Sequence, residues 1–271
     1  MKNLKLNTQR GGLLTIASAC IITAGMLTGC HQKDDVTTKS VVVDIDTIVK
    51  ACPVTSNYTV EYPTEGIQPL IDSIRVWINS QLGGTYTGNL SDAESIVNHY
   101  AQNICRQADE DFDGDEGDEL GISYSDETHI TREYETDNIV TFSLSNYIYT
   151  GGAHGQGVYV GNTFRKDNGA SLTWNIFRED ATEELQQLII GQLLQFFEVK
   201  TTEELNERLL DTDVENIPLP TTPPAFTEHG IQFTYQSYEI APYSEGRPQG
   251  VIAYKDAMPY LTQEASALLA H

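Results

Sequence analysis

The sequence predicts an α+β protein in which antiparallel sheets pack with helices in two lobes. Helical and strand-like patterns come in blocks, in the order helices, strands, helix, strands, instead of alternating one by one. Four prolines at 217–224 then predict an extended connector before the final strands, because proline disfavours both a helix interior and a central strand. We place the lobe boundary at the Gly151-Gly152 pair, which gives an N-terminal lobe at 41–150 and a C-terminal lobe at 151–271.

The N-terminal lobe begins with two expected strands, 40–48 and 57–62, and a turn at 63–66. Apolar residues at three-and-four spacing predict a helix over 67–82 that ends at a glycine pair. A second helix is expected over 91–104, because a serine three residues before a glutamate forms a capping box ahead of another apolar face.

Beyond the acidic stretch at 109–119, apolar residues alternate with polar ones, which predicts antiparallel strands. These expected strands are 122–128, 130–136, 139–149 and 158–164. A continuous apolar stripe then predicts a helix over 185–197. The remaining expected elements are a short helix over 203–210, strands over 230–235 and 250–254, and a terminal helix over 261–269.

The first 29 residues have the layout of an export signal. Three basic residues precede an uncharged apolar stretch at 13–27, and this stretch is too short to span a bilayer core that needs roughly 20 residues. It ends in Leu-Thr-Gly-Cys at 27–30, which resembles the lipobox of bacterial lipoproteins. The resemblance implies a signal peptide at 1–29, lipidation of Cys30 and a tether at 30–40.

The residues directly after Cys30 also resemble a localisation signal. The run His31 to Asp35, a lysine followed by two aspartates, looks like the tag that directs lipoproteins of one group of Gram-negative bacteria to the outer face of the outer membrane. It implies a lipid-anchored protein at the cell surface. A plain solvated tether explains the same residues.

The chain is strongly acidic. Its formal net charge is −23, and removing the signal takes away three basic residues and no acidic one, which leaves −26. Such a charge excludes nucleic acid as a partner and attracts cationic proteins, peptides and metal ions. The same acidity also serves simply to keep a surface protein soluble.

Two cysteines, Cys52 and Cys105, remain after the signal and the lipidated residue are set aside. In an oxidising compartment such a pair either forms a disulfide or stays as two free thiols. Spacing alone does not decide between them, because it does not give the Cα separation.

Three segments together carry a family resemblance. They are YIYTGGAHG at 147–155, NGASLTWNIF at 168–177, and the tyrosine-rich stretch at 230–261. In this order they resemble the extracellular domain of RsiV-type anti-sigma factors, which is also found beside the catalytic domain of PdaC-type peptidoglycan deacetylases. The resemblance covers roughly 40–270. It implies an α+β fold and a role in the cell envelope; in the anti-sigma members this domain binds lysozyme.

The resemblance and the glycine-rich turn point to a ligand-binding face. The candidate residues are Tyr147, Tyr149, Gly151, Gly152, His154, Tyr235, Tyr238 and Tyr243. Tyrosines suit a protein- or sugar-binding surface, but they also fill half-exposed strand positions. The histidine has three alternative roles: pinning the turn by hydrogen bonding, contacting a ligand, or catalysis.

An acidic loop fits the opening of a calcium site. Asp109, Asp111, Asp113 and Asp115 place oxygen ligands on alternate residues. The twelfth position, where a bidentate glutamate belongs, is Leu120. The loop therefore either binds Ca2+ irregularly or is merely solvated, and no other cofactor is indicated.

The motifs of common enzyme classes are missing from the sequence. It contains no nucleophile elbow, zinc helix, phosphate loop or dinucleotide fingerprint. The leading hypothesis is a non-enzymatic, surface-displayed binding module for lysozyme or another cationic envelope-active protein. The alternatives are a hydrolase or accessory module acting on peptidoglycan or glycans, and a structural subunit of an outer-membrane assembly.

Overall fold

The computed structural model describes residues 35–112 and 121–269. The expected signal peptide, Cys30 and the calcium-loop residues Asp113 and Asp115 lie outside the described residues. The end of the expected tether is not a tether, because Val36 is buried and the first strand begins at Thr37.

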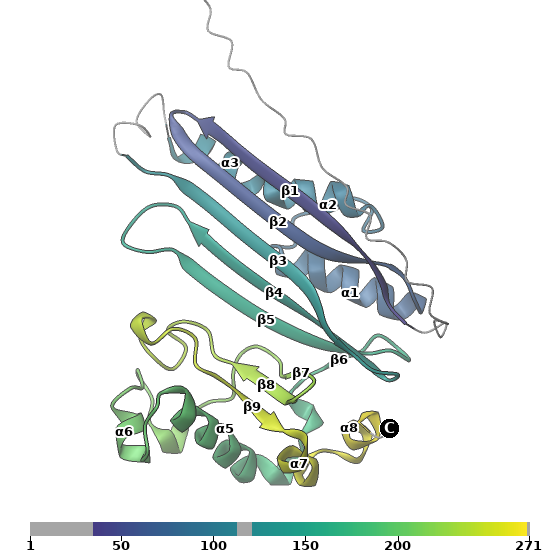
Figure 1. Ribbon diagram of the computed structural model, residues 1–271, viewed down its shortest axis with the longest axis vertical. Coiled ribbons are helices and arrows are strands. Elements are labelled where there is room, and N and C mark those ends of the chain that lie inside the picture. Colours follow the sequence, from purple (N-terminus) through teal and green to yellow (C-terminus); the bar gives the residue numbers. More distant parts are fainter. Residues whose placement is uncertain (1–34, 113–120, 270–271) are drawn as a thin grey trace, which may run out of the picture.

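A six-stranded sheet forms the centre of the molecule (Figure 1). Its strands, in spatial as well as chain order, are β1 (Thr37–Val49), β2 (Cys52–Glu65), β3 (Tyr124–Glu135), β4 (Ile139–Tyr149), β5 (Gln156–Arg165) and β6 (Ser171–Leu172). Neighbouring strands are antiparallel except β2 and β3, which are parallel. The sequence did not predict this pair; it arises because a helical crossover joins the two strands, and a crossover can return the chain in its original direction.

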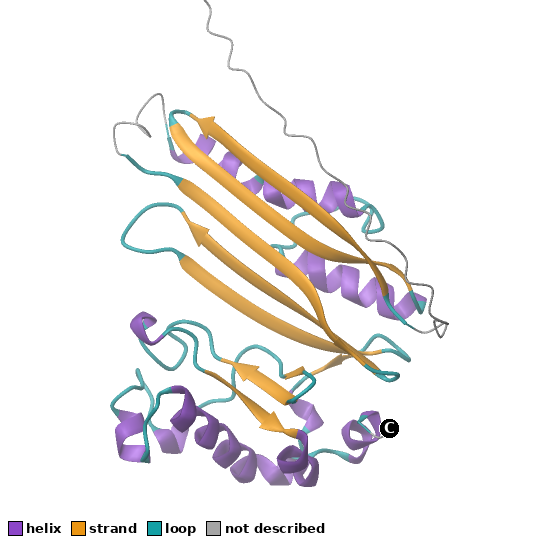
Figure 2. Cartoon of the chain, in the orientation of Figure 1, coloured by secondary structure: helices purple, strands orange, loops and turns teal. Residues whose placement is uncertain are grey.

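Three helices of that crossover cover one face of the sheet, behind β1–β3 in Figure 2. They are α1 (Gln68–Gln81), α2 (Ala93–Ala101) and α3 (Asn103–Asp111). Ile74, Ile78 and Ile96 are fully buried in the core between these helices and the sheet, together with Phe142 of β4. The three-and-four spacing of the apolar residues is what places them on the inward stripe of each helix.

The C-terminal lobe has its own antiparallel sheet and its own core. Its elements are α5 (Thr182–Phe196), α6 (Thr202–Asn206), β7 (Ala225–Phe226), β8 (Gly230–Thr234), β9 (Gln249–Ala253), α7 (Tyr254–Ala257) and α8 (Gln263–Leu268). Short 3-10 turns lie at Trp174–Ile176, Glu179–Ala181, Val214–Asn216, Tyr243–Glu245 and Met258–Tyr260. Leu185, Ile189 and Leu193 form the buried stripe of α5 and share the core with Ile231 and Phe233 of β8.

The two lobes join on the face of the large sheet that the helices α1–α3 leave free. Thr141 and Thr163 alternate with residues of the helix-covered core, so their side chains point to the other face. Thr141 Oγ1 donates to the carbonyl of Phe226 at 2.8 Å, and the backbone N–H of Phe226 donates to Thr163 Oγ1 at 2.9 Å. Strand β7 therefore lies directly on β4 and β5.

The α+β expectation, with sheets, helices and two lobes, is confirmed. The expected boundary at 150/151 does not coincide with the change of sheet, because it falls in the turn of the β4–β5 hairpin; the large sheet continues to Leu172. The two strands expected over 122–136 are one strand, β3.

Two helix boundaries and one turn also differ from expectation. The helix expected over 91–104 is divided at Gln102 into α2 and α3. Its cap is Asp92, whose side chain accepts from the Ser95 N–H, rather than Ser91. The turn expected at 63–66 is shorter, because β2 continues to Glu65.

Candidate functional site

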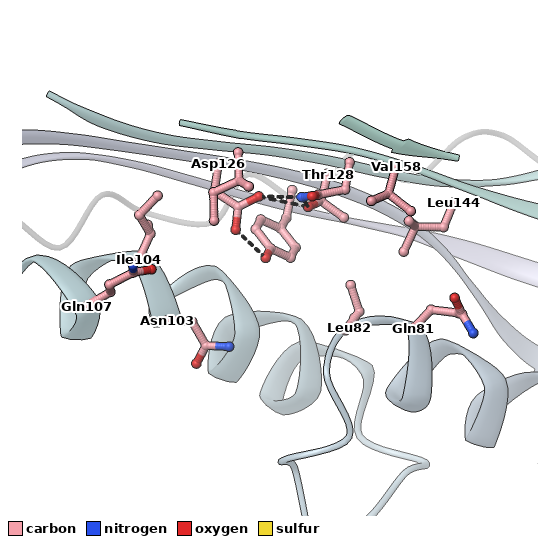
Figure 3. Close-up of a pocket in the computed structure, with 12 residues that line it drawn as sticks. Gln81, Leu82, Asn103, Ile104, Gln107, Asp126, Thr128, Leu144 and Val158 are labelled. Atoms are coloured by element: carbon pink, nitrogen blue, oxygen red, sulfur yellow. Dashed lines mark hydrogen bonds between the residues drawn. The ribbon is translucent and has the colours of Figure 1, made fainter. Parts of the chain in front are cut away.

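A pocket of about 350 Å³ opens between the large sheet and its helical layer (Figure 3). This volume lies at the lower end of the range of roughly 300–1,000 Å³ typical of small-molecule sites. The sheet provides one wall and the end of α1 and the face of α3 provide the other. The lining residues are Tyr58, Gln81, Leu82, Asn103, Ile104, Gln107, Asp126, Thr128, Leu144, Asn146, Ile148 and Val158.

Asp126 of β3 is the acidic group of this pocket and is only 4% exposed. Its Oδ2 accepts from the Tyr58 hydroxyl at 2.7 Å, and its Oδ1 accepts from Thr128 Oγ1 at 3.1 Å and from Asn146 Nδ2 at 2.7 Å. The three donors come from β2, β3 and β4, so the strand register fixes the carboxylate in place.

Burial raises the pKa of Asp126 above its ordinary value, although the hydrogen bonds from Tyr58, Thr128 and Asn146 act in the opposite direction. Burial and the adjacent carboxylate also raise the pKa of Tyr58, so its hydroxyl stays protonated and donates. The site thus holds a carboxyl group in surroundings that oppose its charge.

The other lining side chains are neutral. Four amides, from Gln81, Asn103, Gln107 and Asn146, line the pocket together with aliphatic side chains. Val158 of β5 is 39% exposed, so part of the aliphatic wall meets solvent. The pocket offers hydrogen-bonding groups, apolar surface and a single acidic group.

Sequence reasoning missed this site, although one signal was present. In β3 the inward positions are Tyr124, Asp126, Thr128 and Ile130. A carboxylate at an inward position of an alternating strand is unusual, since burying a charge is costly. Because Asp126 stands at an inward position of the predicted strand, it could have been selected from the 39 acidic residues as a candidate site residue.

Four of the predicted ligand residues do come together, on the opposite side of the large sheet. The ring of His154 stacks on the ring of Tyr243, with ring centroids 3.9 Å apart and planes inclined by 15°. The ring centroids of Tyr238 and Tyr243 are 5.9 Å apart. The Gly155 carbonyl accepts from both the Tyr243 hydroxyl and His154 Nδ1, each at 3.0 Å. A Cβ on Gly155 would lie 2.5 Å from the Tyr147 ring. We call Tyr147, His154, Tyr238 and Tyr243 the aromatic group.

The aromatic group joins the two lobes and is open to solvent. Tyr147 and His154 come from β4 and the β4–β5 turn, whereas Tyr238 and Tyr243 come from the segment between β8 and β9. Tyr147 is 44% exposed and Tyr238 is 55% exposed. Gly155, which the prediction omitted, is the residue that links these rings.

The other predicted ligand residues have structural roles. Tyr235 is fully buried and its hydroxyl donates to the Pro218 carbonyl at 2.6 Å, so the expectation that it contacts a ligand is wrong. The Tyr149 hydroxyl donates to the Gly152 carbonyl at 3.1 Å. Gly151 and Gly152 have φ angles of 90° and 89°, a region that favours glycine and allows the chain to turn.

Cys52 and Cys105 are free thiols in the structure, so the disulfide alternative is not realised there. Cys52 is completely buried, and Cys105 is half-buried against the same small apolar cluster. Burial raises the pKa of both thiols. They therefore act as apolar core residues rather than as reactive groups.

The described part of the expected calcium loop is not a loop. Asp109 and Asp111 belong to the last turn of α3. Asp109 lies 3.5 Å from Lys50 Nζ, and Asp111 Oδ2 accepts from the Tyr124 hydroxyl at 2.9 Å. Within 35–112 and 121–269, no group of three or more His, Cys, Asp or Glu side chains is arranged to hold a metal ion.

None of the helices in the described part of the chain has both the length and the apolar character needed to cross a membrane.

Two family models match consecutive parts of the chain. The model described as Deacetylase PdaC matches residues 52–156, and the model described as a protein of unknown function, DUF3298, matches residues 175–255. The chain contains a PdaC/DUF3298-type domain. Its PdaC-type segment holds nearly all of the pocket. The aromatic group takes Tyr147 and His154 from the PdaC-type segment, and Tyr238 and Tyr243 from the DUF3298-type segment.

Solved structures share the fold of this PdaC/DUF3298-type domain. A DUF3298-family protein from Bacteroides fragilis NCTC 9343 is 23% identical with a TM-score of 0.68, over 86% of this chain and 96% of that chain. A DUF3298-family protein from Pseudomonas aeruginosa PAO1 is 14% identical with a TM-score of 0.57, over 86% of this chain and 97% of that chain. Comparison with curated proteins gives no match.

Proposed function

We propose that this PdaC/DUF3298-type domain is a non-enzymatic binding module of a lipid-anchored protein on the surface of the outer membrane. Its proposed ligand is lysozyme or another cationic, envelope-active protein. The resemblance of 147–155, 168–177 and 230–261 to the extracellular domain of RsiV-type anti-sigma factors supports this choice of ligand.

The observation that carries the proposal is the exposed aromatic group at the junction of the lobes. Large rings held in place by stacking and hydrogen bonds present apolar area at little cost in side-chain entropy. Tyr238 also adopts a φ of 68°, and a non-glycine residue in this region costs of order 1–3 kcal/mol. A strained, exposed tyrosine is more readily understood as a binding residue than as a stabilising one.

Charge supports a basic partner for the same surface. Glu127 of β3 pairs in register with Tyr147 and is well exposed, and the chain as a whole carries −23. A field of this sign speeds the encounter with a cationic protein. Contact with the aromatic rings then provides binding that salt does not screen.

A binding titration tests this proposal. Lysozyme is titrated calorimetrically into the purified chain at an ionic strength of about 0.15 M, where exposed charges further apart than roughly 8 Å are largely screened. We expect Tyr238→Ala and Tyr147→Ala each to weaken binding about tenfold, which is the effect of a moderate hot-spot residue. Val76→Ala, which trims an exposed apolar residue on α1, is the matched control and leaves affinity unchanged.

Two results would contradict the proposal. The first is that lysozyme binds only in dilute salt and not at this ionic strength. Such binding would be non-specific attraction between a basic protein and an acidic one. The second is unchanged affinity in both tyrosine variants.

A second role, action on peptidoglycan or binding to it, is favoured by the description of the family model that matches 52–156. Its test is release of product from cell-wall fragments by the purified chain. If the Tyr147→Ala and Tyr238→Ala variants still release product from cell-wall fragments, this role is favoured over the first.

A further inference from the structure

The pocket beneath the helical layer contains a buried carboxylate that no cation balances. Among the described residues, the groups bonded to Asp126 are hydroxyls and an amide, and no lysine, arginine or histidine lines the pocket. Buried charges in proteins are generally paired with an opposite charge. The molecule itself shows the usual arrangement elsewhere: buried Lys166 lies 2.8 Å from Asp35 and 3.0 Å from Glu135.

The carboxylate also keeps capacity for another donor. Two carboxylate oxygens together offer about four acceptor sites, and the protein uses three of them. The free site lies on Oδ2, which among the described residues accepts only from Tyr58.

A second polar group beside Asp126 is incompletely satisfied. Ser56 of β2 is the register partner of Asp126 across the parallel pair and is fully buried. Its Oγ has no hydrogen-bond partner among the described residues. Unsatisfied buried polar groups are rare and costly. Ser56 itself does not line the pocket, but it shows that the polar groups on this part of the inner face are incompletely paired among the described residues.

We propose that this pocket binds a primary alkylammonium group, with the ammonium on Asp126 and the aliphatic stem against Leu82, Ile104 and Val158. The walls match this chemistry: aliphatic side chains suit methylene groups, and the neutral amides of Gln81, Asn103 and Gln107 repel neither end of the ligand. An anion is disfavoured by the lone carboxylate. A sugar is disfavoured because the only aromatic ring in the lining, that of Tyr58, is buried and offers little exposed face for stacking.

The pocket is a different site from the aromatic group. Asn146 and Ile148 line the pocket, so Tyr147 between them points to the opposite face of the sheet. The ammonium proposal therefore does not depend on the proposed lysozyme-binding role. Its ligand is either a free diamine or the lysine side chain of a protein, which share the same end group.

Calorimetric titration of the purified chain tests the site with three probes. Cadaverine represents a free diamine, N-acetyl-lysine methylamide represents a lysine side chain in a protein, and N-acetyl-norleucine methylamide has the stem without the ammonium. We expect millimolar or tighter binding of at least one amine and none of the norleucine derivative. Binding of cadaverine alone identifies the free diamine as the source, and binding of the lysine derivative alone identifies a protein side chain.

Two isosteric variants locate the binding. Asp126→Asn keeps the shape of the side chain and removes its charge, so amine affinity should fall about tenfold or more, the loss expected for a charge-assisted hydrogen bond. Glu127→Gln removes an exposed carboxylate from the next residue of β3, on the other face, and should leave affinity unchanged. Melting curves of both variants establish that they are folded.

Three outcomes overturn the proposal: no heat from either amine, equal binding of the norleucine derivative, or an equal loss in both variants, which would assign the binding to general acidity.

Discussion

At the scale of single residues, two buried ionisable groups differ in their partners: Lys166 is bound by carboxylates, whereas Asp126 is bound by neutral groups. Lys166 is 2% exposed, and although burial lowers its pKa, hydrogen bonds to Asp35 and Glu135 outweigh this and raise it. Asp126 is equally enclosed but is held only by neutral donors, and burial dominates its pKa. The first group fastens the beginning of the folded chain to the sheet, whereas burial opposes the charge of the second beside a pocket.

Asp126 should make the protein less stable at neutral pH than its uncharged isostere. Its pKa is higher in the folded chain than in the unfolded chain, so its contribution to stability is fully present below the unfolded pKa and is lost as the pH rises through the folded pKa. We expect Asp126→Asn to melt higher than the parent at pH 7, with a difference that shrinks as the pH is lowered toward the unfolded value.

Thermal unfolding of both proteins over a pH series, without amines present, measures this difference. A variant that melts lower than the parent at pH 7 would mean that the three hydrogen bonds outweigh the cost of burial. Glu127→Gln again provides the comparison, since its carboxylate is exposed.

At the scale of elements, the close approach of β5 and β7 depends on one glycine. A Cβ on Gly161 would lie 2.5 Å from the Cβ of Ala225, at the place where the C-terminal lobe packs on the large sheet. Glycine weakens a strand interior unless another chain segment approaches closely. This position explains why β7 can hydrogen-bond with Thr141 and Thr163.

Gly161→Ala should lower the free energy of unfolding by about 1–3 kcal/mol, the usual cost of overpacking a close contact. The matched control is Gly191→Ala in α5, where a Cβ meets no atom within 4 Å and alanine is the better helix former by about 1 kcal/mol. Denaturant titrations of both variants measure the two effects. If Gly161→Ala unfolds with the same free energy as the parent protein, β7 moves away from β5 at no cost and the prediction is wrong.

At the scale of the whole molecule, the lobes are joined by direct contacts rather than by a linker. The hairpin that contains the expected boundary at 150/151 belongs entirely to the large sheet, and the Tyr243 hydroxyl reaches its turn from the other lobe. Only five residues separate Cys30 from buried Val36, and the six steps along the chain reach at most about 22 Å. A lipid at Cys30 would thus hold the folded body close to the membrane.

The anchor can be tested in a bacterial cell. Cys30→Ser should abolish labelling of the protein by radioactive palmitate and move it from the membrane fraction to the soluble envelope fraction, because no cysteine is then left at the cleavage point to carry the lipid. Cys105→Ser, which changes a half-buried thiol in the folded body, should leave both unchanged. Unaltered labelling of Cys30→Ser would exclude the lipobox interpretation.

Local pattern determined much of this architecture from the sequence alone. Periods of two and of three-to-four located β4, α1 and α5 within a few residues, because side-chain burial repeats along each element. The sequence also identified the four residues of the aromatic group. It did so through the family resemblance, since their positions lie almost a hundred residues apart.

Tertiary structure alone decided the parallel pairing of β2 with β3, and with it the pocket. Tyr58 and Asp126 are 68 positions apart, and neither belongs to a motif. They meet because the α1–α3 crossover returns the chain beside β2 in the same direction. Burial of Tyr235, against the exposure of Tyr238, was likewise decided by packing in the C-terminal core. A sequence pattern fixes which face of its own element a side chain occupies, whereas pairing between distant elements fixes what that face meets.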